Sequence, residues 1–167
     1  ALGVVPFGLM DENNQEYREV VGDLVGYHPE EAKKLFAEGL AEEGMTADDF
    51  KNFVILYNTA ESHKKIAQAV QEMWRTNLGI ELQLENVDFQ VKLDREKAGD
   101  YHISRAGWVG DYTDPMTFID LWFSESSFND ARFNDARYDE LVLTAKSTAD
   151  QKVRFDAMRE AEQILMD

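Results

Sequence analysis

Residues 53–85 carry the pattern of a strand, a helix and a second strand in direct succession. Residues 53–57 form a continuous apolar run, which is typical of a strand that is covered on both faces. Residues 62–77 place apolar side chains at helical spacing, and residues 80–85 alternate between apolar and polar side chains. Because this succession forms a parallel βαβ unit, the chain is predicted to belong to the α/β class. The helical side chains that we expect to be buried are Ile66, Val70, Met73 and Trp74.

Further helices and a third strand are predicted around this unit. One helix spans residues 29–43, where Pro29 suits the first helical position and Gly44 ends the helix. A shorter helix is expected over residues 89–97, and a third strand over residues 101–106. With only these strands among many helices, the chain is predicted to contain a partial sheet.

The C-terminal part of the chain predicts three more helices. Asp114 is expected to cap an apolar helix that begins at Pro115, and a second helix is predicted over residues 135–145. Thr148 and Gln151 have the spacing of a capping box, which predicts the start of the last helix. The side chains of these helices that we expect to face the core are Trp122, Tyr138, Leu141, Val142, Ala145, Val153, Ala157, Ala161, Ile164 and Leu165.

The stretch from Arg105 to Pro115 is the strongest candidate for a functional site. It follows a predicted strand, turns on glycines, and presents Trp108, Asp111 and Tyr112. Loops at the carboxyl ends of strands in α/β sheets are where ligands usually bind. The alternative is a turn whose aspartates only bond backbone groups, which is what most turn aspartates do. From the residues alone, both interpretations stay open.

The composition excludes several classes of function. A net charge of −16 argues against binding of nucleic acid and of anionic membranes, both of which require clustered lysine and arginine. The chain has no cysteine, so disulfides and thiol catalysis are excluded. Its three histidines lack the spacing of metal ligands, and no catalytic motif is present. We therefore expect no metal, no cofactor and no enzyme, in a single domain over residues 1–167.

Several segments of the chain resemble the peptide-binding proteins of ABC importers, the oligopeptide- and dipeptide-binding family. The stretch Arg105-Ala-Gly-Trp-Val-Gly-Asp-Tyr-Thr-Asp-Pro115 is similar to the signature loop of that family. Val54-Ile-Leu-Tyr-Asn-Thr59 and the following His63-Lys-Lys-Ile-Ala67 resemble its strand and first crossover helix. The closing helices are represented by Tyr138-Asp-Glu-Leu141 and by Arg159-Glu-Ala-Glu-Gln-Ile-Leu-Met166.

The resemblance implies a fold and a function for the chain. The fold would be one lobe of a two-lobed, type II periplasmic-binding-protein-like protein, with the other lobe and the final strands outside this chain. Because the chain does not begin with methionine, we expect a processed form or a piece of a longer protein. The implied function is capture of oligopeptides outside the cytoplasm by a monomer that delivers them to an ABC-transporter permease. The family further implies either a lipid-anchored protein of Gram-positive cells or a periplasmic protein.

The resemblance also implies roles for individual residues. Asp111 matches the aspartate that pairs with the α-ammonium group of the peptide. Gly107 and Val109 match positions whose main chain bonds the peptide backbone, and Trp108 matches an aromatic beside a side-chain pocket. For Trp108, the absent other wall of the cleft predicts an exposed side chain.

Two further residues are implied by the same likeness. Arg105 and His63 match positions that meet the carboxylate of shorter peptides. Arg105 has the alternative of a structural ion pair, and His63 has the alternative of a solvated helix start.

Other functions fit the resemblance as well. The chain could come from a receptor for one peptide pheromone, or from a solute-binding protein for nickel, a sugar or haem. An enzyme on an unrelated α/β fold would require a nucleophile with a base, or a metal site, near Asp111, and the sequence offers neither.

Overall fold

The computed structural model describes residues 2–167, and the contacts within the chain divide it into two compact units. The sheet unit is the continuous stretch Tyr27–Gly107. The helical unit joins the chain up to Gly26 with Trp108–Asp167. These two units are parts of this chain and are distinct from the two lobes expected of the complete protein. That the chain is a single lobe of such a protein stays a prediction.

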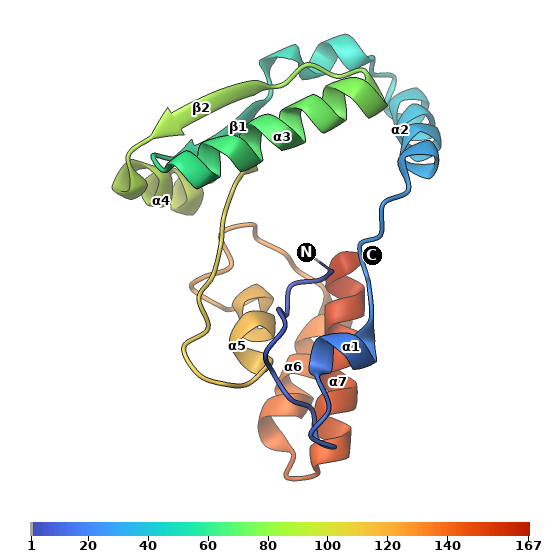
Figure 1. The fold of residues 1–167 in the computed structure, drawn as a ribbon, viewed down its shortest axis with the longest axis vertical. Helices are drawn as coiled ribbons and strands as arrows, with labels where there is room; N and C mark the ends of the chain where they lie inside the picture. The colour runs from blue at the N-terminus through green and yellow to red at the C-terminus, as the bar shows by residue number, and fades with distance from the viewer. Residues whose placement is uncertain (1) are drawn as a thin grey trace. The chain divides into compact units, whose positions relative to one another are not determined.

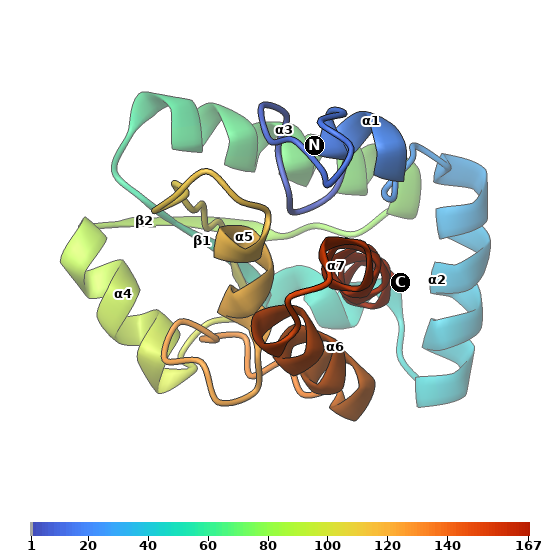
Figure 2. The ribbon, with the colours of Figure 1, turned by 90° about the horizontal axis from the view of Figure 1, so that it is seen from below.

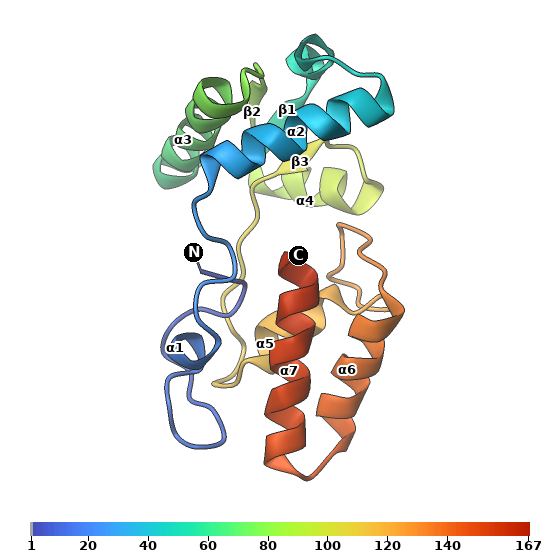
Figure 3. The same cartoon turned by 90° about the vertical axis from the view of Figure 1, so that its right-hand side faces the viewer.

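The sheet unit contains a three-stranded parallel sheet in the order β2-β1-β3. Strands β1 and β2 are labelled in Figure 1, and Figure 3 also labels β3. The central strand β1 pairs in register with both neighbours, with Leu56 opposite Glu85 of β2 and opposite Ser104 of β3. Parallel pairing on both sides confirms the βαβ unit that the sequence predicts. The elements of the unit are α2 (Pro29–Glu43), the 3₁₀ helix η1 (Ala47–Asn52), β1 (Val54–Asn58), α3 (Glu61–Leu78), β2 (Gln83–Val87), α4 (Phe89–Ala98) and β3 (Ile103–Ser104).

The boundaries of α2, β1, α3 and α4 lie close to the predicted ones. Helix α2 runs from Pro29 to Glu43, and Gly44 follows with a φ of 65°, a left-handed conformation that glycine adopts without strain. Strand β1 is covered on both faces, as its apolar run predicts, because Leu56 is wholly buried and Ile55 nearly so. Helices α3 and α4 also end before left-handed glycines.

Both edge strands differ from their predicted bounds: β2 spans Gln83–Val87 in place of residues 80–85, and β3 is shorter than predicted. Ile80 and Leu82 are buried as their alternation predicts, yet strand β2 begins only at Gln83. Strand β3 is reduced to Ile103 and Ser104, whereas the prediction covered residues 101–106. Just before β3, the ring of His102 stacks on that of Phe53, with the ring centroids 4.6 Å apart.

Helix α3 buries a narrower stripe than predicted. Ala67 is buried, and Val70 and Trp74 pack against the same core, which confirms these two predicted positions. Ile66 and Met73 were expected to face the core, but their side chains are 44% and 53% exposed. Both lie on the flanks of the stripe that Ala67, Val70 and Trp74 form at spacings of three and four residues.

The helical unit is built on a pair of helices near the C-terminus, α6 and α7, which lie side by side (Figure 3). Helix α5 packs against α7, and Figure 2, which looks along the pair, shows α5 beside it. The elements are α1 (Tyr17–Val21), α5 (Met116–Ile119), the 3₁₀ helix η2 (Asp120–Trp122), α6 (Ala136–Ser147) and α7 (Gln151–Met166).

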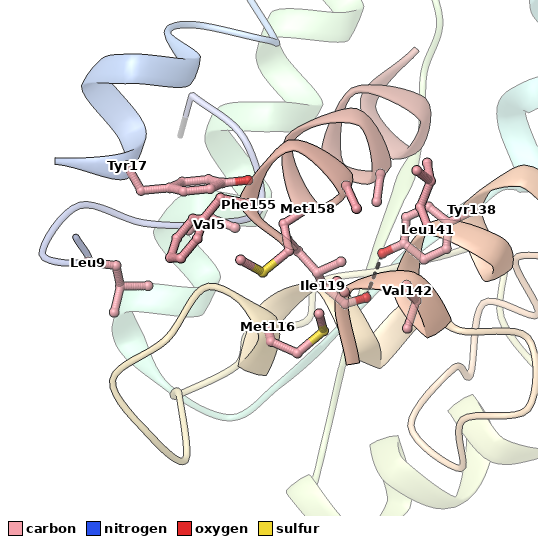
Figure 4. Packing of buried hydrophobic residues seen from close by; sticks show 13 residues of the cluster. Val5, Leu9, Tyr17, Met116, Ile119, Tyr138, Leu141, Val142, Phe155 and Met158 are labelled. Carbon is pink, nitrogen blue, oxygen red and sulfur yellow. Dashed lines mark hydrogen bonds between the residues drawn. The ribbon is translucent and has the colours of Figure 1, made fainter. Parts of the chain in front are cut away.

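The core of the helical unit is apolar, and the hydroxyl groups of Tyr17 and Tyr138 are buried with it (Figure 4). Tyr138 is fully buried and donates its hydroxyl hydrogen to the carbonyl oxygen of Ile119 at 2.5 Å. This bond satisfies the phenol and ties α6 to the end of α5. The predicted core positions of α6, Tyr138, Leu141, Val142 and Ala145, are all buried.

Two predictions for this unit are wrong in detail. The apolar stretch after Pro115 is a short α-helix followed by a 3₁₀ turn, although Met116 and Ile119 are buried as expected of it. The cap of α7 is Asp150, whose Oδ1 accepts from the main-chain nitrogens of Lys152 and Val153, and the predicted capping box does not form.

Within α7, the predicted inward face is confirmed except at its first turn. Ala157 and Ala161 are buried, and Ile164 and Leu165 pack against the core. Val153 is 45% exposed, because it lies where the helix has just begun. Trp122 is partly buried against the same core, as predicted.

A buried ion pair joins the beginning of the chain to its last helix. The guanidinium of Arg18 contacts Glu162, and these side chains are 1% and 0% exposed. Arg18 Nε also donates to the carbonyl of Val5 at 3.0 Å, and Glu162 Oε1 accepts from the main-chain nitrogen of Val5 at 2.9 Å. Gly3 is required beside them, because a Cβ there would lie 2.5 Å from Glu162 Oε1.

We predict that Glu162→Gln lowers the free energy of unfolding by about 3–5 kcal/mol, because it leaves the Arg18 charge buried without a counter-charge. The matched control is Glu160→Gln, which removes a half-exposed partner of Arg137 on the same helix. That change is expected to cost about 0–1 kcal/mol. Urea unfolding of both variants makes the comparison, and equal losses would contradict a structural role for the buried pair.

Candidate functional site

The stretch between Arg105 and Pro115 is fixed at both ends. At its start, the main-chain nitrogen of Arg105 donates to the carbonyl of Leu56 at 2.8 Å. At its end, both carboxylate oxygens of Asp114 accept from Arg154 at 2.8 Å. Asp114 Oδ1 also accepts from the nitrogen of Met116 at 2.9 Å, which confirms the predicted cap. The hydrogen bond with Asp114 raises the pKa of Arg154, so the guanidinium stays charged.

Asp111 has a fixed main chain and an exposed side chain. Its nitrogen donates to Oγ1 of Thr117 at 3.0 Å, and Thr117 is buried in α5. Gly110 makes this approach possible, because a Cβ there would lie 3.0 Å from Cγ2 of Thr117 and 3.1 Å from the ring of Phe118. The carboxylate of Asp111 is therefore held at the surface by a buried anchor.

A cavity of about 370 Å³ opens beside Asp111 in the helical unit. Three carboxylates line it, those of Asp111, Asp120 and Glu125, against the single ammonium of Lys146. Lys146 Nζ lies 3.0 Å from Asp120 Oδ2, so one carboxylate is already neutralised. The remaining negative charge favours a cationic group in the cavity. Its walls are completed by Trp108, Tyr112, Thr117, Leu121, Phe123, Ser126, Ser127 and Phe128.

Aromatic side chains form one wall of this cavity. Trp108 meets Phe128 edge to face with ring centroids 4.9 Å apart. Trp108 is partly buried, which corrects the expectation of an exposed side chain, because Phe128 comes from the loop after η2 to cover it. Its Nε1 is buried without a hydrogen-bond partner among the described residues. Partial burial raises the pKa of Tyr112, and the carboxylates of Asp120 and Asp114 raise it further.

Arg105 and His63 are brought into contact within the sheet unit. His63 lies at the start of α3, and its Nε2 is 3.0 Å from a terminal nitrogen of Arg105. Because a guanidinium only donates, His63 Nε2 must accept, and Nδ1–H then donates to Oδ1 of Asn58 at 2.8 Å. Both residues thus lie near the carboxyl ends of parallel strands, where ligands bind in α/β sheets.

The predicted site residues therefore fall into two groups. Trp108, Asp111 and Tyr112 line one cavity, and Arg105 and His63 form another cluster. Val109 is 88% exposed, and Gly107 is exposed as well.

Sequence reasoning missed several residues of both groups. Asn58 is the last residue of the central strand, a position at its carboxyl end that could have marked it as a partner of His63. Phe128 and Lys146 gave no local signal, because only tertiary packing brings them to the cavity. No group of side chains within residues 2–167 is arranged to hold a metal ion, and no helix there is both long and apolar enough to cross a membrane.

Comparison with known proteins gives consistent matches. Residues 3–130 match the family model described as bacterial extracellular solute-binding proteins, family 5 Middle. The chain is 41% identical over 136 residues to the periplasmic oligopeptide-binding protein of Salmonella typhimurium, covering 81% of this chain and 24% of that protein. It is 32% identical over 159 residues to a dipeptide-binding protein of Bacillus subtilis, covering 95% of this chain and 29% of that protein.

The solved structures agree with the sequence matches. The crystal structure of a peptide-binding protein of a peptide ABC transporter superposes with a TM-score of 0.90 at 31% identity. This match covers 99% of the present chain and 74% of the other. It confirms the predicted α/β fold of the type II periplasmic-binding-protein class. The chain spans less than a third of the length of the Bacillus and Salmonella relatives.

We predict that Thr117→Val frees the backbone at Asp111. The change is nearly isosteric and removes the acceptor of the Asp111 nitrogen, a hydrogen bond worth about 1 kcal/mol. Hydrogen exchange of the Asp111 amide should therefore accelerate roughly fivefold, since 1.4 kcal/mol is about tenfold.

The matched control is Thr148→Val, which removes a similar bond to the nitrogen of Asp150, 3.1 Å long in the wild type. This variant should leave exchange at Asp111 unchanged. Unchanged exchange in Thr117→Val as well would show that Thr117 does not anchor the site.

Proposed function

This chain belongs to the bacterial extracellular solute-binding proteins of family 5, and we propose that it captures oligopeptides for import by an ABC transporter. The observation that carries the proposal is the exposed carboxylate of Asp111 at the edge of a cavity with surplus negative charge. An α-amino group has a pKa near 8 and is positively charged at neutral pH. A carboxylate makes a charge-assisted hydrogen bond with such a group, roughly twice as strong as a neutral one.

The second cluster suits the other end of a peptide. Arg105 uses one terminal nitrogen on His63 and carries five N–H donors in all, so donors remain for a carboxylate. Contact with the lone pair of His63 leaves the positive charge of Arg105 in place. We assign the peptide ammonium to Asp111 and the carboxylate of short peptides to Arg105 and His63.

Recognition of the peptide main chain would be independent of the peptide sequence. The main chains of Gly107 and Val109 lie in an exposed stretch and offer N–H and C=O groups. Peptides laid alongside such a stretch are bonded through groups that every residue shares. Trp108 adds an apolar wall at the mouth of the cavity, which fits an adjacent side chain of the ligand.

The wider setting follows from this role. The complete protein would bind its ligand without catalysis, act as a monomer outside the cytoplasm and hand the peptide to a membrane permease. Its attachment would be a lipid anchor or confinement to a periplasm. The relatives whose names state peptide binding support the peptide over nickel, sugar or haem as the ligand.

We predict that Asp111→Asn in the full two-lobed protein weakens peptides with a free N-terminus by about 3–5 kcal/mol, the typical loss when one partner of a buried charge pair is removed. This is a hundredfold to a thousandfold loss of affinity or more, at roughly tenfold per 1.4 kcal/mol. N-acetylated peptides lack the ammonium, so the same variant should bind them about as weakly as the wild type does. Calorimetry of both proteins with both peptides gives a double-mutant cycle.

The control variant is Glu42→Gln, which removes an exposed carboxylate of α2. It should leave both affinities unchanged. A coupling near zero between Asp111 and the free N-terminus would remove the main support for the proposal.

We further predict that the 167-residue chain folds by itself but binds free peptide poorly. Closure of two lobes buries the ligand in this class of proteins, and this chain supplies only one of them. Calorimetry of the chain with the same free peptide makes the test, and micromolar or tighter affinity would contradict the division of the site between lobes.

A further inference from the structure

A buried polar chain of three side chains leads to the residue next to Arg105. Lys92 and Glu96 of α4 form an ion pair, and Ser104 Oγ of β3 donates to Oε1 of Glu96 at 2.5 Å. We propose that Glu96 and Ser104 are positioning residues, which aim Arg105 at His63 and so prepare the carboxylate site. The inference deepens the proposed function and rests on it for the role of Arg105 in binding.

The ion pair in this chain of bonds is buried, and the chemistry of its carboxylate fixes the direction of the hydrogen bond from Ser104. The side chains of Lys92 and Glu96 are only 4% and 7% exposed, whereas the comparable pair Lys34 and Glu38 on α2 is 74% and 54% exposed. The same oxygen of Glu96 receives both the Lys92 ammonium and the Ser104 hydroxyl. A carboxylate cannot donate, so the hydroxyl hydrogen of Ser104 must point at α4.

Because side chains alternate along a strand, the direction of the Ser104 side chain sets the direction of the Arg105 side chain. Successive side chains of a strand point to opposite faces. Ile103 packs into the core that α3 covers, and Ser104 bonds to α4 on the opposite side of the strands (Figure 2). Arg105 is next, so it turns back to the face of Ile103 and α3, where it meets His63.

The third strand needs such support because its own pairing is minimal. Strand β3 has two residues, paired with Ile55 and Leu56 on one side only. Beyond this ladder, the nitrogen of Arg105 makes a single further bond to Leu56. Without the Ser104 bond, the end of β3 is held by main-chain bonds on one edge. The main-chain position from which the Arg105 side chain extends is then less firmly fixed.

The test uses the labelled chain itself without peptide, and follows the ¹⁵N resonance of His63 Nε2 by NMR at about pH 8, where an ordinary imidazole is neutral. The variant Arg105→Ala supplies the position of this resonance when the contact is absent. In Ser104→Ala, we expect the resonance to move most of the way to that position. Ser104→Thr keeps a hydroxyl and should return it to the wild-type position.

Two controls separate positioning from general disturbance. Ser147→Ala removes a hydroxyl that donates to the carbonyl of Leu143 in the helical unit, and it should leave the resonance in place. Glu38→Gln breaks the exposed pair on α2 and should do the same.

A second variant guards against misfolding of Ser104→Ala. The double change Lys92→Met with Glu96→Met removes the acceptor of Ser104 without leaving a buried charge, and replacements of this kind are often tolerated. It should shift the His63 resonance as Ser104→Ala does. A wild-type resonance in either folded variant would overturn the proposal. Because no peptide is present, this outcome is independent of whether Asp111 binds an ammonium group.

Discussion

The central strand β1 is the constraint on which the sheet unit depends. Leu56 at its middle is wholly buried, and its main chain pairs with a parallel strand on each side. Because parallel strands end at the same edge, the residues that follow β1 and β3 are brought together there. Asn58, His63 and Arg105 meet through this arrangement, although 42 positions of sequence separate His63 from Arg105. The donor and the acceptor of each hydrogen bond among them then follow, because arginine can only donate and His63 Nε2 must accept.

The stretch after β3 shows how rigidity and exposure are combined in one segment. The residues that a ligand would meet, Asp111 and Val109, are exposed. The stretch is fixed through Asp111 and Asp114, whose partners are the buried Thr117 and the ion-paired Arg154. Preorganised groups of this kind lose little conformational freedom on binding, which leaves more of the interaction energy for affinity. The same logic applies to Arg105, whose neighbour Ser104 is bonded to a buried carboxylate.

Local patterns in the sequence predicted most elements, and long-range packing accounts for what they missed. The helix starting at Pro29 and the apolar strand β1 were predictable because each carries its own signals. Strand β3 was predicted too long, since its bounds depend on pairing with β1, a long-range contact that no local pattern contains. For the site, the residues of the signature stretch could be named from sequence. Phe128 and Lys146 could not, because they come from a loop and a helix that only the tertiary fold brings to the cavity.

The pairing of Arg18 with Glu162 has a consequence for the order in which the chain folds. The sheet unit is one uninterrupted stretch, so all of its contacts are available once Gly107 has been synthesised. The helical unit joins both ends of the chain, and its buried ion pair closes a loop of 144 positions. The entropic cost of closing a loop increases with the length of the loop, although slowly, and this cost opposes folding before the contacts form. During synthesis, the N-terminal segment must therefore wait for α7, while the sheet unit can already have folded between them.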